Sequence, residues 1–520
     1  MRSTIATVTA AFLLVAPTAR AQDPPPSSDP VLEAIWREGI EQSRVAELAQ
    51  VLLDSLGPRL TGSPGSEAAA NWLIDTYRSW GIDARSEPYG TWRGWRRGIS
   101  HLDLVEPRVR TLEATMLAWS PGTQGPVRGS VVALPHLADT QELTNFLAGV
   151  RGQFVLLTAP EPSCRPEDSW EQWSTPESLA RHQVDLDSTR ADWIDRARST
   201  GASSLGEITE MLEGAGTAGL LSSEWSRGWG VEKVFSAATQ AIPQVNVSCE
   251  DYGLLWRLAV RGQGPVVRLA AEAEPLGDVP VANTIGMIRG SDLPDEYVLL
   301  SAHFDSWDGA SGATDNGSGT VLMMEVMRIL RRVYPRPKRT IMVGHWNGEE
   351  QGLNGSRAFA EDHPEILAGL QVLLNQDDGT GRIDRITMEG IVGAGAYFRS
   401  WLGNIPEDLT RGITLVDPGA PGRGGTDNWS FVCAGAPAFG LNSASWDYRA
   451  YTWHTNRDTY DKLVTDNLRA NATLIAMLAY LASEEPDRIP RTKRELPVDA
   501  RTGAPATWPE CTNPDRNFVR

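Results

Sequence analysis

The chain has 520 residues, of which 41% are hydrophobic and 22% charged, a composition that excludes disordered, collagen-like and coiled-coil proteins. This length predicts about two or three domains. The formal charge of −18 at pH 7 means that the surface on average repels phosphate, so a nucleic-acid partner is not expected.

The first 21 residues have the features of an export signal. Arg2 supplies a positive charge, Ile5–Val15 an apolar stretch, and Ala19-Arg20-Ala21 a small-x-small cleavage site. The apolar stretch is shorter than the roughly 20 residues needed to span a bilayer. We therefore expect cleavage, no membrane span in the mature chain, and a periplasmic or extracellular location. Residues 22–42 begin with a Pro- and Ser-rich stretch and are expected to be a linker.

The next part of the chain changes character twice. A helix is expected over 43–53 and an amphipathic helix over 66–80, separated by a glycine-rich loop. Short β-rich runs then surround a polar, tryptophan-containing stretch, which indicates a separate module. The expected boundaries are 43–125 for the first part of the main domain, 126–268 for the module, 269–485 for the rest of the main domain and 486–520 for a tail.

The third part of the chain alternates strands and helices. Buried strands are expected over 297–301, 339–344 and 370–375, and apolar helices over 317–332, from about 356, and over 465–483. This order predicts an α/β fold with a mostly parallel, doubly wound sheet flanked by helices. Because ligands bind beyond the carboxyl ends of the strands in such sheets, the catalytic residues should follow the strands.

Histidine and acidic residues follow each of these strands. They are His303, Asp305 and Asp315 after the first strand, Glu349 and Glu350 after the second, Asp377 and Asp378 after the third, and His454 later in the chain. Each alone is weak evidence, but acids crowded into one crevice repel one another unless cations neutralise them. Imidazole and carboxylate are ligands that zinc and similar divalent ions accept. The pattern predicts a metal site.

The ligand set is sufficient for two ions. Asp315 can offer one carboxylate oxygen to each ion, which leaves His303 and Asp377 for one ion and Glu350 and His454 for the other. Two ions roughly 3.5–4 Å apart lower the pKa of a shared water and polarise a carbonyl group. The expected cofactor is therefore a pair of zinc ions, with other divalent metals as an alternative.

Two further acids have expected roles in catalysis. Glu349 is the spare carboxylate, which we expect to take the proton of the water and pass it to a leaving amine. Asp305 lies two residues after His303 and is expected to hold the second imidazole nitrogen. The predicted reaction is hydrolysis of an amide bond, and the predicted partner is a peptide substrate.

These motifs, in this order, resemble those of the co-catalytic dizinc exopeptidases. That family includes bacterial zinc aminopeptidases, glutamate carboxypeptidase II and plasma glutamate carboxypeptidase (carboxypeptidase Q). The resemblance covers about Ser43–Arg110 and Asn283–Ser483, and it implies the zinc exopeptidase fold, the same ligand set and Glu349 as the base. By the same resemblance, residues 126–268 are a protease-associated domain inserted into the peptidase fold.

The chain departs from the family immediately before the last metal-binding histidine. Many members have a tyrosine there, whose hydroxyl stabilises the oxyanion, whereas this chain has Trp453. The donor is left open between Tyr448, Tyr451 and the indole N–H of Trp453.

The end of the peptide that is recognised is also left open. An aminopeptidase must hold an ammonium group, for which Asp427 is a candidate, whereas a carboxypeptidase must hold a carboxylate, for which Arg449 is a candidate. The excess of acids in the loops favours release of an N-terminal residue from short peptides or dipeptides. Tyr451 and Trp453 are further candidate substrate contacts, and C-terminal cleavage is the alternative.

Two other functions are weaker alternatives. A glutaminyl cyclase shares the fold but uses one zinc, and a complete set of five ligands favours two. A binding protein on an inactive peptidase scaffold is disfavoured because the base and every ligand are present. The four cysteines could form one or two disulfides in an exported protein, and their pairing is left open, as is the oligomeric state.

Overall fold

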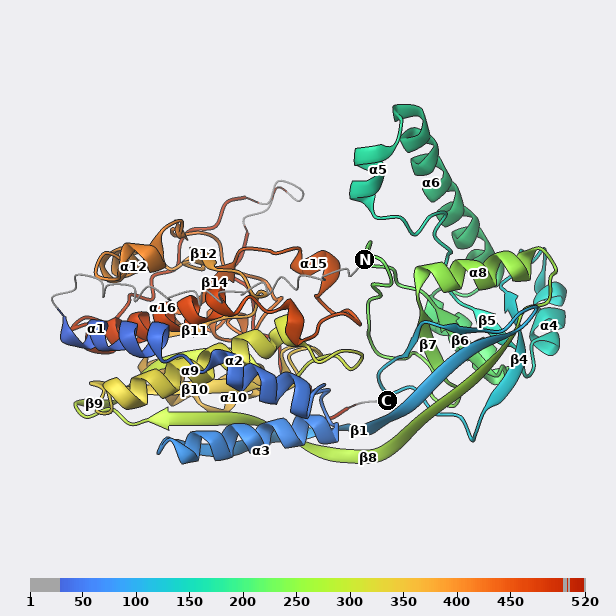
Figure 1. Cartoon of the computed structure of the whole chain (residues 1–520). Coiled ribbons are helices and arrows are strands. Elements are labelled where there is room, and N and C mark those ends of the chain that lie inside the picture. The colour runs from blue at the N-terminus through green and yellow to red at the C-terminus, as the bar shows by residue number, and fades with distance from the viewer. Residues whose placement is uncertain (1–28, 499–502, 504–505, 519–520) are drawn as a thin grey trace, which may run out of the picture.

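The computed structural model describes residues 29–498, 503 and 506–518, so the predicted export signal and the first part of the predicted linker lie outside the described residues. Two lobes are visible, joined by two long strands (Figure 1). The larger lobe contains helices α1–α3 and all elements from β9 to α16, and the smaller lobe is formed by residues 107–265. Within the described part of the chain, none of the helices has the length and apolarity required to cross a membrane.

Four parallel strands form the centre of the larger lobe. They lie in the order β14-β11-β9-β10 and comprise β9 (Leu293–His303), β10 (Arg339–Trp346), β11 (Leu370–Asn375) and β14 (Ala438–Ser443). Short strands β12 (Ile383–Thr387) and β13 (Thr414–Val416) extend one edge. The α/β fold class predicted from the sequence is confirmed.

Both faces of this sheet are buried. Successive side chains of a strand point to opposite faces, so each strand contributes residues to two cores. Val298 and Leu300 belong to the apolar core that also contains α9 (Ser318–Val333) and α16 (Thr465–Glu484). Leu299 points the other way, into a core shared with α10 (Asn354–Asp362) and α14 (Trp429–Val432). The parallel strands therefore end at one edge of a sheet whose two faces are covered by helices.

Residues 30–41 are helical rather than linker. Asp29 caps α1 (Pro30–Trp36) by accepting a hydrogen bond from the amide of Val31 at 2.8 Å, and Pro30 occupies the first turn, where it costs no hydrogen bond. Ile35 and Trp36 are buried in the large core. The π-helix η1 (Arg37–Glu41) continues from α1, so the chain joins the fold at Asp29. The following helices are α2 (Val45–Gln50), η2 (Val51–Leu56) and α3 (Pro64–Ser79).

The smaller lobe is more helical than its sequence indicated. Between 126 and 265 it contains strands β4 (Val127–Ala133), β5 (Phe154–Leu156), β6 (Gly219–Ser222) and β7 (Gln244–Val247), and helices α4 (Thr140–Gly149), α5 (Glu167–Trp173), α6 (Pro176–Ser199), α7 (Leu205–Gly214) and α8 (Cys249–Val260). The four strands pair in parallel, and β2 (Arg110–Leu112) and β3 (Ala114–Met116) precede them. The longest helix, α6, buries none of its residues, so it lacks the apolar stripe that reveals a helix in a sequence. An inserted protease-associated domain stays a prediction.

The two lobes are joined by a long antiparallel ladder. Strand β1 (Asp83–Glu106) pairs with β8 (Val266–Ile288) from Asp83–Met287 at one end to Glu106–Val266 at the other. β8 also pairs with β10 in the larger lobe and with β4 in the smaller lobe. In Figure 1 the two strands of the ladder run side by side between the lobes.

Each lobe contains one disulfide. Cys164 pairs with Cys249 in the smaller lobe, and Cys433 pairs with Cys511, which ties the C-terminal tail to α14. The structure thus supplies the pairing that the sequence left open.

Candidate metal centre

The expected metal ligands meet where the central strands end. His303 is the last residue of β9, Asp315 lies in the π-turn η3 (Ala313–Gly317) before α9, and Glu350 and Asp377 follow β10 and β11. His454 follows the short helix α15 (Tyr448–Tyr451). Two groups of three residues have ligand atoms within 4.8 Å of one another, and these groups are His303, Asp315 and Asp377, and Asp315, Glu350 and His454.

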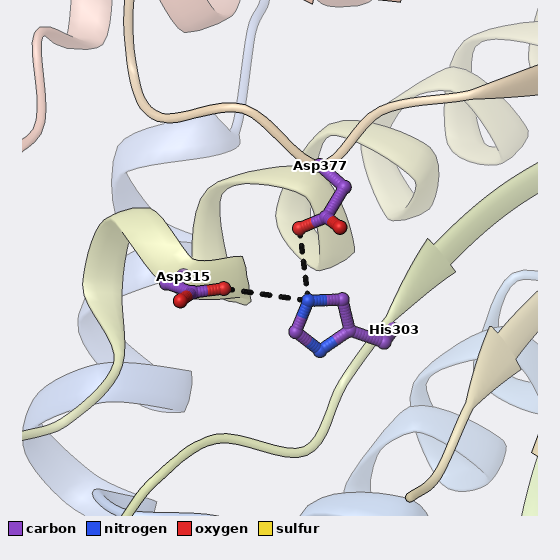
Figure 2. A group of neighbouring side chains, drawn as sticks. All are labelled: His303, Asp315 and Asp377. Carbon is purple, nitrogen blue, oxygen red and sulfur yellow. Dashed lines mark hydrogen bonds and ion pairs between the residues drawn. The ribbon is translucent and has the colours of Figure 1, made fainter. Parts of the chain in front are cut away.

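The first group is centred on His303 (Figure 2). Its Nε2 atom lies 2.9 Å from Oδ1 of Asp377 and 3.4 Å from Oδ1 of Asp315. Asp378 instead accepts a hydrogen bond from the Asn442 side chain at 3.4 Å. The structure therefore places Asp377, and not its neighbour, in this group.

The second group is centred on His454. Its Nε2 atom lies 2.9 Å from Oε2 of Glu350 and 3.1 Å from Oδ2 of Asp315. The two carboxylate oxygens of Asp315 thus face different imidazoles. This is the arrangement that a carboxylate shared between two cations requires.

Burial and mutual repulsion shift the pKa values of these groups. Burial lowers the pKa of His303, but the carboxylates of Asp377 and Glu349 outweigh burial and hold it well above its usual value. Burial and the charge of Asp315 raise the pKa of Glu350 to about 7. A divalent cation would neutralise the carboxylate charges that contribute to both shifts. The nitrogen and oxygen donors therefore fit a metal centre.

Glu349 lies beside both groups without belonging to either. One of its carboxylate oxygens is 4.0 Å from Nε2 of His303. Burial raises its pKa well above the usual value, and the charges of Asp377, Asp427 and Glu350 add to the rise against the opposing effect of His303. Glu349 thus places a carboxyl group with a raised pKa next to the two groups of candidate ligands.

Asp305 supports the site in a different way from that expected. The backbone carbonyl of Asp305, at 3.1 Å, is nearer to Nδ1 of His303 than its carboxylate, at 3.6 Å. The carboxylate accepts hydrogen bonds at 3.3 Å from the amides of Glu349 and Glu350 and from the hydroxyl of Thr61. Asp305 therefore holds the loop that carries Glu349 and Glu350, as well as the imidazole of His303.

Two buried residues that hold the loop around Asp315 were not expected from the sequence. The Asp458 carboxylate accepts hydrogen bonds from the amides of Thr314 and Asp315 at 2.9 and 3.0 Å, and the Arg59 guanidinium donates to the carbonyl of Gly312 at 2.9 Å. Asp458 lies four residues after His454, so its position next to an expected ligand offered a signal. Arg59 offered none, because a guanidinium in a glycine-rich loop is usually exposed.

The expected substrate-binding residues lie at different depths around the centre. Trp453 stacks on His454 with ring centroids 3.9 Å apart, and the guanidinium carbon of Arg449 lies 5.7 Å from the Trp453 ring. Asp427 is fully buried, and burial raises its pKa to about 8. Tyr451 is only partly buried.

Tyr448 is the best placed of the three candidate oxyanion donors. Burial raises its pKa well above the usual value, and the charges of Asp315 and Asp377 raise it further. By contrast, the charges that raise the pKa of Tyr451, after burial, belong to Asp168 and Asp447. The buried Tyr448 is therefore influenced by the charges of two candidate ligands, whereas Tyr451 is influenced by other acids.

Comparisons with known proteins agree with this geometry. Residues 283–479 match peptidase family M28. Carboxypeptidase Q of Mus musculus is 24% identical over 454 residues, which cover 87% of this chain and 88% of that protein. Carboxypeptidase Q of Xenopus laevis is 26% identical over 462 residues, with the same coverage of both chains.

Solved structures share the fold. A peptidase M28 precursor from Shewanella amazonensis superposes with a TM-score of 0.62 at 24% identity and covers 88% of this chain and 97% of its own. A zinc aminopeptidase from Bacillus subtilis superposes with a TM-score of 0.54 at 17% identity and covers 86% and 97%. The match of residues 283–479 to peptidase family M28 and the two ligand groups at the strand ends indicate that the chain is a metallopeptidase.

Proposed function

We propose that the chain is an exported zinc exopeptidase that holds two ions and cleaves the N-terminal peptide bond of short peptides or dipeptides. The observation that carries the proposal is the position of Asp315, whose two oxygens face His303 and His454, with Glu349 beside them. The fold is shared with a zinc aminopeptidase, which supports zinc as the metal.

The five candidate ligands would suffice for two ions, with Asp315 able to contribute to both. His303 and Asp377 would hold one ion, and Glu350 and His454 the other. When bound, the two ions would lower the pKa of a shared water and polarise the scissile carbonyl. The loops behind the ligands are held by Asp305 and Asp458, so the donor atoms are arranged before a metal arrives.

Glu349 and Tyr448 would move the proton and stabilise the oxyanion. The Glu349 carboxylate accepts a proton from the attacking water and returns it to the leaving amine, a role suited to a carboxyl group whose pKa is raised by burial. The hydroxyl of Tyr448, whose pKa is raised by burial and by the charges of Asp315 and Asp377, would donate a hydrogen bond to the carbonyl oxygen as negative charge develops there.

A pair of substitutions tests these roles. Glu349→Gln removes the proton acceptor but no ligand, so turnover should fall by roughly 100- to 10,000-fold while zinc per chain, measured by atomic emission, stays at the wild-type value. Tyr448→Phe should lower kcat with little change in KM. Glu41→Gln, at an exposed position of η1, is the matched control. Turnover of Glu349→Gln within tenfold of wild type would contradict the assignment.

The buried acid Asp427 supports recognition of a free N-terminus. Its charge raises the pKa of Glu349, so the two carboxyl groups lie close together in the same site. A substrate ammonium group placed between them would offset their repulsion. This favours an unblocked N-terminal residue next to the scissile bond.

A carboxypeptidase is the second candidate, favoured by Arg449. This exposed guanidinium lies against Trp453, next to His454, where it could hold a terminal carboxylate. The carboxypeptidase Q relatives add weight to this alternative. Peptides with free or acylated amino ends distinguish the two: slow cleavage of the acylated series supports the aminopeptidase. Equal rates that are lost in Arg449→Ala support the carboxypeptidase.

Export is supported by the predicted signal at the N-terminus and by the two disulfides. Both disulfides would be reduced in a glutathione-buffered cytosol and persist in the periplasm or outside the cell. Fractionation of the native host, with an antibody against the chain, tests this location.

A further inference from the structure

The two histidines of the metal centre are held in different ways. Nδ1 of His303 faces the backbone carbonyl of Asp305 at 3.1 Å, which fixes the orientation of the ring. Nδ1 of His454 is buried and finds no hydrogen-bond partner among the residues that the structure describes. His454 also has a φ of 54°, a left-handed conformation that a non-glycine residue keeps only when its surroundings enforce it. His454 therefore needs support from outside its own ring.

That support comes from the smaller lobe. Residues 230–236, here called the strap, lie along the loop that carries His454. The amide of Val234 donates to the carbonyl of His454 at 2.7 Å. Two further bonds fix the register, because the amide of Asn456 donates to the carbonyl of Glu232 at 3.0 Å and the amide of Glu232 donates to Oδ1 of Asn456 at 2.9 Å. The strap is thus bonded to the chain at His454 itself and two residues after it.

Lys233 of the strap bonds to the backbone of the loop that precedes His454. Its ammonium group donates to the carbonyls of Arg449 and Trp453 at 2.8 and 2.6 Å, and lies 4.6 Å from the centre of the Trp453 ring. Arg449 lies within α15, and Trp453 lies two residues after its end. Lys233 therefore joins the helix to the residue next to His454.

The imidazole ring is fixed by aromatic packing to which the strap contributes. Trp453 stacks on the His454 ring at 3.9 Å between centroids, while Phe235 of the strap meets it edge-on at 5.2 Å and Trp307 at 6.0 Å. Packing on several sides leaves the ring one orientation, with Nε2 toward Asp315 and Glu350. Contacts of this kind replace the missing bond at Nδ1.

We propose that the strap is a positioning element for His454, so that the smaller lobe sets the affinity for the ion that Glu350 and His454 hold. This inference rests on the two-ion site of the proposed function. It assigns to the smaller lobe a part in building the metal centre, in addition to any role in shaping access for substrates. Loss of a residue that orients a metal ligand typically weakens metal binding by roughly 10- to 100-fold.

The test measures zinc binding in four variants of the full-length protein. Lys233→Met keeps the apolar stem over Trp453 but removes the ammonium, Lys233→Arg restores a cation, and Asn456→Ala removes the side-chain bond to the strap. Lys493→Met is the matched control, because Lys493 also lies 4.6 Å from a tryptophan ring, that of Trp508, outside the strap. Zinc per chain after dialysis, the two affinities by chelator competition, and kcat at increasing zinc are recorded, with thermal unfolding alongside.

The expected result is a selective loss of one ion. Lys233→Met and Asn456→Ala should fall from two zinc ions toward one, with the weaker affinity reduced by roughly 10- to 100-fold and kcat restored by excess zinc. Lys233→Arg should recover most of the affinity, and Lys493→Met should match wild type. Wild-type affinity for both ions in Lys233→Met and Asn456→Ala, or an equal loss of both ions, overturns the inference and leaves the two-ion site standing. A wild-type protein that holds fewer than two ions overturns the two-ion site itself.

Discussion

Asp377 and Asp378 are adjacent in the chain, yet only Asp377 faces His303, because the backbone after β11 turns the next side chain toward Asn442. Asp377→Ala should therefore lower zinc occupancy strongly, since it removes a ligand from a site of few donors. Asp378→Ala should leave occupancy near wild type, which makes it the matched control. Zinc per chain after dialysis measures the occupancy of both variants. A larger loss of zinc in Asp378→Ala than in Asp377→Ala would identify Asp378 as the ligand instead.

The clustering of the candidate ligands could be predicted from the sequence. Residues that follow parallel strands meet at one edge of the sheet, so His303, Glu350 and Asp377 were expected to lie close to one another, and the structure brings them together. Lys233 could not be found in this way. It meets Trp453 from a position 220 residues away in the chain, and a single lysine in a loop has no local pattern that reveals such a contact.

At the scale of elements, the N-terminal helix η1 packs so closely on α16 that its glycine has no room for a side chain. A Cβ at Gly39 would overlap Oγ1 of Thr473 and lie 3.0 Å from its Cβ. Gly39→Ala should therefore lower the free energy of unfolding by about 1–3 kcal/mol, measured by urea titration.

A double variant and a control show whether this contact is the cause. Gly39→Ala combined with Thr473→Gly should recover part of the loss, because the obstructing side chain is gone. Gly149→Ala at the end of α4, where no heavy atom lies within 4 Å of the added Cβ, should be neutral or stabilising by up to about 1 kcal/mol. Equal effects at both glycines would count against a steric origin.

The elements that the sequence predicted well are those with a local period. Strand β11 was expected over the residues that form it, and α16 was expected to within a residue at its end, because both are strongly apolar. The β1–β8 ladder was not predicted. β1 contains several arginines and glycines, and its extended conformation depends on a partner strand far away in the sequence.

At the scale of the whole molecule, Glu232 makes the stability of the protein depend on pH. Burial raises its pKa to about 8 from 4.5, although the amide of Cys249 donates to its carboxylate at 2.8 Å. Between pH 4.5 and about pH 8, Glu232 keeps its proton in the folded protein but has lost it in the unfolded chain. Stability contributed by this group is therefore complete below pH 4.5 and is lost as the pH rises toward 8.

Glu232→Gln should remove this dependence. The difference in unfolding free energy between wild type and variant is expected to change by about 1.4 kcal/mol per pH unit within that window, in the direction that favours the variant at higher pH. Urea titrations at pH 5, 6, 7 and 8 check the slope. Parallel curves for the two proteins would show that Glu232 titrates normally in the folded state.

The ladder of β1 and β8 has a mechanical consequence. A two-stranded ribbon that is hydrogen-bonded along its length has no single-chain hinge, and it yields most easily by twisting, above all at irregular positions such as those between Pro88 and Gly90 and between Gly94 and Trp95. The strap is one of several further contacts between the lobes, which include the ion pair of Glu113 and Arg457. Because the strap is bonded to the backbone of His454, a twist of the ladder would strain those bonds, and a load on the smaller lobe would be transmitted to this candidate metal ligand.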